Sequence, residues 1–198
     1  MKSKWRDADP VCRGSKSLVG KTIRWFTRED GEPTRCNHVG MLGQLTPVRW
    51  RYLKDIRQYE LPREWMGEWC VFEADWKIQT VLWSEYRQTD ADLWVFRNPM
   101  LKRYQCGDII EAAMQHQNGP YAFKLLGRLA MDKTFNTHFT ERSDPELLIC
   151  SRYLAQCYAT SGIYEWDHVS ANGATPDDIW DECQKPPWEQ VWTNTENA

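Results

Sequence analysis

Residues 146–154 read ELLICSRYL, and this stretch decides how the rest of the chain is interpreted. It places Cys150 where an apolar run meets a helical pattern, in which Leu147, Leu154 and Tyr158 share one face. The unpaired N–H groups at a helix N-terminus favour a thiolate over a thiol, and a nucleophilic cysteine needs the thiolate. Most free cysteines, however, are small buried hydrophobic residues. The stretch therefore predicts either a catalytic or a structural thiol, and upstream residues must decide between them.

Length and composition favour one packed domain and exclude several functional classes. The 198 residues suffice for one buried core, and the 12 tryptophans are typical of a folded protein. A formal charge of −3 provides no general attraction to nucleic acid or to an anionic membrane. No stretch reaches the roughly 18 apolar residues of a membrane span. We therefore expect neither a nucleic-acid partner nor an integral membrane segment.

The N-terminus is polar and lacks the apolar core of a secretory signal. We therefore expect the protein in the cytoplasm of the producing cell, or delivered by a phage or another route that needs no signal peptide.

The seven cysteines are odd in number, and no two have C-x-x-C spacing. This pattern indicates neither a structural zinc site nor a disulfide framework. Reduced thiols are the simplest interpretation. The sequence predicts no metal site and no cofactor.

The order of apolar and capping patterns predicts an α+β domain over residues 18–182, with a peripheral segment over 1–17 and a loose tail over 183–198. Strand patterns cover residues 21–27, 36–44, 69–74, 78–83 and 93–97. Helix patterns are a capping box at 108–111, a short helix at 121–126, a helix start between 143 and 150, and a capped turn at 175–180. Residues 46–67 look like an insertion with one helical turn near 52–59.

Two strand residues are candidate partners of Cys150. His38 shares a strand face with Gly40, which is expected to leave open space beside the imidazole. Glu73 falls on an otherwise apolar face with Val71, where a carboxylate needs a partner. A histidine, a carboxylate and a cysteine leading into a helix are the groups of a cysteine-nucleophile acyl-transfer site.

Each of these residues also has a structural interpretation. A lone histidine on a strand is more often structural than catalytic, and Glu73 could simply pair with an arginine. Asn37 is an alternative group for orienting the imidazole. His168 is the reserve base if His38 lies far from Cys150.

Five short motifs resemble, in their order along the chain, those of the permuted papain-like amidases of the NlpC type. They are Asn37-His38-Val39-Gly40, Phe72-Glu73-Ala74, Gly119-Pro120-Tyr121, Cys150-Ser151 and Thr175-Pro176-Asp177-Asp178. In the permuted group the histidine strand precedes the cysteine, as it does here. The resemblance covers about residues 18–180 and implies a papain-like antiparallel sheet packed against helices.

The resemblance also implies a role for each site residue. Cys150 would be the nucleophile, His38 the base and Glu73 the group that orients the imidazole. Tyr121 would stand near the oxyanion, and the backbone N–H of Cys150 or Ser151 would be a second donor. The implied enzyme is a cysteine hydrolase, an amidase or peptidase that cleaves amide bonds of peptidoglycan peptides, or acyl-lipid linkages, through a thioester.

Two departures from the family pattern leave other functions open. Ile149 precedes the cysteine where a polar residue is usual, and Arg152-Tyr153 stands where small or acidic residues are usual. Both favour a catalytically inactive structural or binding module, for example in a phage virion or a secretion assembly. An acyltransferase acting on lipids or amines would share the thioester chemistry.

Overall fold

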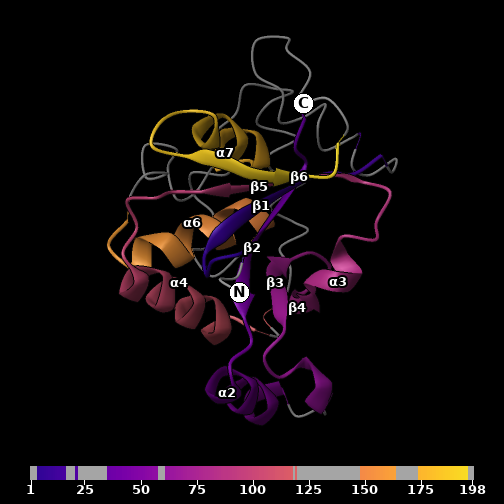
Figure 1. Ribbon diagram of the computed structural model, residues 1–198, viewed down its shortest axis with the longest axis vertical. Coiled ribbons are helices and arrows are strands. Elements are labelled where there is room, and N and C mark those ends of the chain that lie inside the picture. The colour runs from indigo at the N-terminus through magenta and orange to yellow at the C-terminus, as the bar shows by residue number, and fades with distance from the viewer. Residues whose placement is uncertain are drawn as a thin grey trace.

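An antiparallel sheet of six strands organises the part of the chain that the computed structural model describes, residues 4–16, 21, 35–57, 61–117, 119, 148–163 and 174–195 (Figure 1). The spatial order is β4-β3-β2-β1-β5-β6. The strands are β1 (Asp9–Gly14), β2 (His38–Gln44), β3 (Trp69–Ala74), β4 (Ile78–Leu82), β5 (Asp92–Arg97) and β6 (Glu189–Thr193). Every neighbouring pair is antiparallel. With its helices, the sheet confirms the predicted α+β class.

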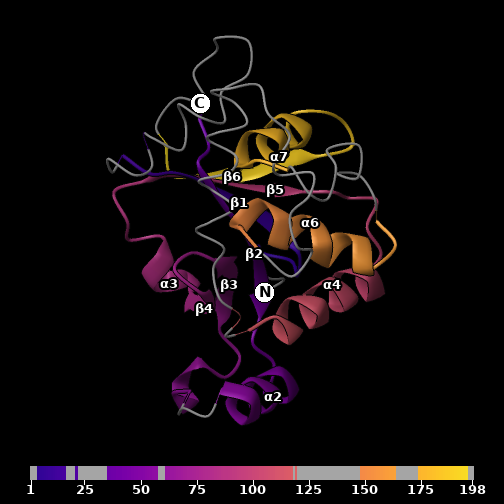
Figure 2. The ribbon, with the colours of Figure 1, turned by 180° about the vertical axis from the view of Figure 1, so that it is seen from behind.

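The helices lie on both faces of this sheet. They are α2 (Pro47–Arg57), the 3-10 helix η1 (Arg63–Trp65), α3 (Trp83–Tyr86), α4 (Arg103–Gln115), α6 (Cys150–Thr160) and α7 (Pro176–Cys183). Helix α6 lies in front of the sheet in Figure 2 and behind it in Figure 1, next to α4. Helix α2 lies at the lower end of both views, away from α6. No helix among the described residues has the length and apolar character to cross a bilayer.

The alternation of side chains along the strands divides the core into two layers. Val39 and Phe72 belong to the larger layer, which the sheet forms with α4, α6 and α7. Leu42 and Val71 point to the opposite face and pack with Trp83 of α3 in the smaller layer. Strand β5 is buried on both faces, as its continuous apolar run predicts.

Both ends of the described chain contribute strands, which differs from the expectation of a peripheral N-terminal segment and a loose tail. Strand β1 lies between β2 and β5, and β6 pairs with β5. The polar composition of residues 1–17 suggested a surface position. Asp9 is nevertheless 2% exposed, because the Arg97 guanidinium is bound to its carboxylate, with 3.0 Å between Nε and Oδ1. Pairing of the charges allows this polar segment to occupy the sheet.

Several predicted boundaries also change. Helix α4 begins at Arg103, well before the expected start at residue 108, and the Gln105 side chain accepts a hydrogen bond from the Lys102 N–H at 2.9 Å. Helix α2 spans 11 residues instead of one turn. The β4 strand ends one residue early, because Trp83 begins α3. The Thr175 capping box and its helix are confirmed. Residues 22–27 and 121–126 lie outside the described part of the chain.

Candidate functional site

Cys150 is the first residue of helix α6, which settles where this helix begins. Ile149 occupies the N-cap position and provides no side-chain cap, and the first turn contains no acidic residue. The first intrahelical bond runs from the Tyr153 N–H to the Ile149 carbonyl at 2.8 Å. The N–H groups of Cys150 and Ser151 therefore precede the hydrogen-bonded ladder, at the positive end of the helix dipole. The thiol lies where these groups can stabilise negative charge.

His38 and Glu73 lie in contact on adjacent strands. The His38 Nε2 atom is 2.7 Å from Glu73 Oε2, and Glu73 is 2% exposed. Glu73 is the register partner of Gly40. A Cβ at Gly40 would lie 2.8 Å from a Val71 methyl and 3.2 Å from the Glu73 Cβ. The expectation of open space beside Gly40 is thus wrong: β3 fills it, and this close approach brings the carboxylate to the imidazole.

The Cys150 side chain is the second group near the His38 imidazole, close enough to influence its charge state. Because Nε2 faces Glu73, the ring nitrogen left for the sulfur is Nδ1. Burial disfavours the imidazolium, but interactions with Cys150 and Glu73 outweigh burial and hold the pKa of His38 well above its usual value. Burial would raise the pKa of Glu73, but the His38 charge and its hydrogen bond lower it below the usual value. The imidazolium is therefore stabilised chiefly by the buried Glu73 carboxylate that it contacts, with Cys150 nearby.

Ser151 does not direct its side chain to this site. Its hydroxyl donates a hydrogen bond to the Ala174 carbonyl, and the residue is fully buried. The contribution left to Ser151 is its backbone N–H. Tyr121 and the reserve base His168 both lie outside the described residues.

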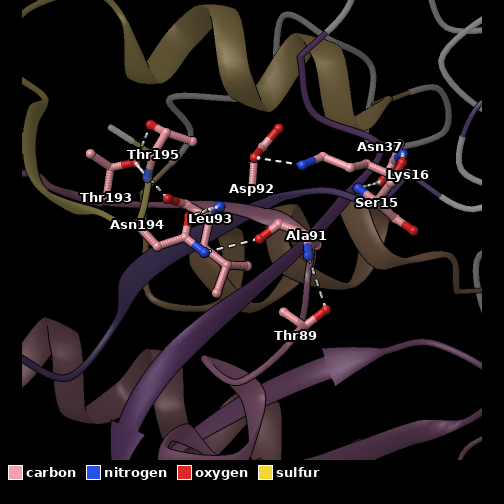
Figure 3. A network of polar contacts seen from close by, with 10 residues as sticks. All are labelled: Ser15, Lys16, Asn37, Thr89, Ala91, Asp92, Leu93, Thr193, Asn194 and Thr195. Carbon is pink, nitrogen blue, oxygen red and sulfur yellow. Dashed lines mark hydrogen bonds and ion pairs between the residues drawn. The ribbon is translucent and has the colours of Figure 1, made fainter. Parts of the chain in front are cut away.

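Asn37 does not orient the imidazole. Its amide oxygen accepts from the Ser15 N–H and its amide nitrogen donates to the Ser15 carbonyl, both at 3.0 Å (Figure 3). This exchange fastens the end of β1 to the residue before His38. Asn194 makes a similar exchange with Leu93 and Ala91, which fastens the C-terminal segment to β5 (Figure 3). Asn37 therefore positions the start of β2.

Three polar residues that the sequence did not single out surround the Glu73 carboxylate. The Gln79 amide donates to Glu73 Oε1 at 2.9 Å. Tyr86 and Arg13 are the other polar residues that interact with this carboxylate, although the Tyr86 hydroxyl makes no hydrogen bond among the described residues. A signal for Gln79 existed, because a tight β3–β4 hairpin pairs it with Glu73. No local pattern indicated Tyr86, which reaches the site from the short helix α3.

Comparisons with known proteins inform the fold. No protein-family model and no curated protein matches the chain. Among solved structures, the chain is similar to the metalloprotein YiiX from Escherichia coli O157:H7, described as DUF1105. The TM-score is 0.61 at 14% identity, over 98% of this chain and 100% of that chain. This likeness covers nearly the whole fold and concerns the fold alone. In the described ranges, no group of three or more His, Cys, Asp or Glu side chains could hold a metal ion.

Proposed function

We propose that this protein is a cysteine hydrolase of the permuted papain-like, NlpC type, which cleaves amide bonds through a thioester. One observation carries the proposal: the His38 imidazole contacts the buried Glu73 carboxylate at 2.7 Å and interacts with Cys150 at the start of α6. A thiol, an imidazole and an orienting acid in this sequence are the groups that nucleophilic acyl transfer needs.

In this mechanism the Cys150 thiolate attacks the carbonyl carbon of the amide. The N–H groups at the start of α6 stabilise the negative charge that develops on the carbonyl oxygen. The His38 imidazolium then gives its proton to the departing amine, which leaves an acyl group on the sulfur. The neutral imidazole next removes a proton from water, and the resulting attack on the thioester releases the acid and regenerates the thiolate–imidazolium pair. Glu73 holds the ring orientation and stabilises the imidazolium in both steps.

The papain-like assignment is supported by the arrangement of the elements. A helix that begins at the cysteine packs on an antiparallel sheet, and the histidine and the acid lie on neighbouring strands. The order histidine strand, acid strand and cysteine helix is that of the permuted group. The substrates we propose are the amide bonds of cell-wall peptides. In that case the protein would reach the wall from the cytoplasm of a producing cell or with a phage.

Two other functions have specific support. Cys150 is only 4% exposed and Arg152 only 1%, which suits an inactive structural or binding module. The structural neighbour is described as a metalloprotein, which makes metal binding at the thiol and the imidazole a second candidate. An acyltransferase would use the same thioester and differ only in the nucleophile that accepts the acyl group.

The test is the turnover of purified peptidoglycan peptides, followed by liquid chromatography and mass spectrometry. We expect the wild type and Cys157→Ala to release a new amine and a new carboxylate, and Cys150→Ala to release neither. Cys157 is a matched control because it lies on the same helix, fully buried. A thioester adduct on Cys150 in the intact mass identifies the intermediate, and an added amine that captures the acyl group identifies a transferase. Equal turnover by Cys150→Ala would contradict the proposal.

A further inference from the structure

We propose that Gln79 and Tyr86 are positioning residues for Glu73: Gln79 fixes the carboxylate toward His38 by a hydrogen bond, and the Tyr86 phenol borders it. This inference rests on the proposed function and extends the site from three residues to five. Neither residue touches Cys150 through a described bond, so both would act on the chemistry through Glu73.

The two oxygens of Glu73 are held by different donors. Gln79 donates to Oε1 at 2.9 Å, and His38 lies 2.7 Å from Oε2. Gln79 is the register partner of Glu73 across the β3–β4 pair, so the backbone hydrogen bonds of this pair fix the position of the Gln79 Cα atom beside Glu73. The carboxylate cannot rotate toward or away from the imidazole without losing one of these two bonds. Gln79 thereby sets the direction in which Glu73 presents its charge.

Tyr86, on the short helix α3, adjoins the same carboxylate. Burial and the negative charge of Glu73 raise the pKa of the Tyr86 phenol well above its usual value, so the hydroxyl keeps its proton. Among the described side chains the hydroxyl has no well-aligned hydrogen-bond partner, and Glu73 and Arg13 are the polar groups that adjoin it. The Arg13 guanidinium lies 5.5 Å from the centre of the Tyr86 ring. A protonated phenol beside a buried carboxylate stabilises its ionised form.

The charged groups near His38 determine whether the loss of Gln79 or Tyr86 raises or lowers the pKa of His38. Cys150 of α6 and Glu73 of β3 favour the imidazolium. Arg13 of β1, the register partner of His38, stays charged and interacts with both Glu73 and Asp75. If the Gln79 bond or the neighbouring Tyr86 hydroxyl is removed, the ionised carboxylate becomes less stable. His38 then loses part of the negative charge that stabilises its imidazolium, and its pKa falls.

The experiment measures the His38 pKa by NMR of ¹⁵N-histidine-labelled protein. The chain has four histidines, and the His38 signals are those missing from His38→Gln. Gln79→Met removes the amide donor at similar volume, and Tyr86→Phe removes only the hydroxyl. Thr80→Val is the matched control, because it removes one buried hydrogen bond of β4, to Gln117, on the other face of that strand. Gln79→Asn, which withdraws the amide by one methylene, replaces Gln79→Met if that variant does not fold.

We expect the His38 pKa to fall by about 0.5 to 1 unit in the Gln79 and Tyr86 variants and to stay at the wild-type value in Thr80→Val. An unchanged His38 pKa in both the Gln79 and Tyr86 variants overturns the inference, and so does an equal fall in Thr80→Val. The proposed function is tested separately by Cys150→Ser. If that change leaves the His38 pKa unaltered, the thiolate–imidazolium pair is absent, whatever Gln79 and Tyr86 do.

Discussion

Replacement of Glu73 by glutamine tests the site most directly, because it removes a charge and keeps the shape. In the wild type each carboxylate oxygen accepts one hydrogen bond, from Gln79 and from the Nε2–H of His38. A glutamine side chain has only one accepting atom. If its oxygen faces His38, its NH2 faces Gln79, whose own amide must turn over to accept. Even in that arrangement the variant loses the charge that strengthens the bond to His38.

The size of the effect follows from the charged hydrogen bond that is lost. A hydrogen bond to a charged group contributes about 1.5 to 3 kcal/mol, and a rate changes tenfold for each 1.4 kcal/mol or so. We therefore expect kcat to fall by about 10- to 150-fold. Glu73 is 2% exposed and bound to His38, so it acts through the imidazole and KM should change little. A loss confined to kcat is typical of a group that acts in the transition state.

The assay is steady-state hydrolysis of a purified muropeptide, with the rate of Cys150 alkylation by iodoacetamide as a measure that needs no substrate. Mass spectrometry locates the label, because the other cysteines are also free thiols. Asp75→Asn is the control, since it removes a half-buried carboxylate two residues along without breaking a described bond to His38. We expect Asp75→Asn to change kcat by less than about threefold, because solvent screens the interactions of a charge near the surface.

Wild-type kcat and alkylation rate in Glu73→Gln would refute the reasoning and leave a Cys150–His38 dyad. A rise in KM at constant kcat would instead show that Glu73 acts in ground-state binding, which its burial argues against.

Three further predictions concern stability and metal dependence. Cys157→Ala removes a fully buried thiol, so it should lower the free energy of unfolding by about 1–2 kcal/mol and leave kcat at the wild-type value. Cys150→Ala should instead abolish turnover and leave the midpoint of urea unfolding within error of wild type. The raised pKa of His38 stabilises the fold at low pH, and this stability is lost as the pH rises through the His38 pKa. The lowered pKa of Glu73 stabilises the fold at higher pH, and this stability is lost as the pH falls through the Glu73 pKa. Glu73→Gln should therefore flatten the profile of Tm against pH at its acidic end, and an acidic limb as steep as that of the wild type would show that other carboxylates cause it. Prolonged dialysis against EDTA should leave the alkylation rate of Cys150 unchanged, because the imidazole is already held by Cys150 and Glu73; a rate that falls and returns with added zinc would support the metal-binding candidate.

The sequence by itself determined the types of element that carry the candidate site. The period-two patterns predicted that His38 and Glu73 lie on strands, and both do. The apolar pattern before and after Cys150 predicted a helix near it, and the capping residues at Thr175 predicted another, and both form. These signals are local, because a strand face or a helix cap depends on only about three to five neighbouring residues.

Only the tertiary structure decided how those elements meet. His38 and Glu73 are 35 residues apart, and their 2.7 Å approach depends on the β2–β3 register and on the missing side chain at Gly40. The polar segment of β1 became central because Arg97, far along the chain, neutralises its buried Asp9. Gln79 and Tyr86 likewise join the site through a hairpin and a short helix. Pairing between distant charges and close approach between strands depend on packing of the whole domain, which no local pattern of residues specifies.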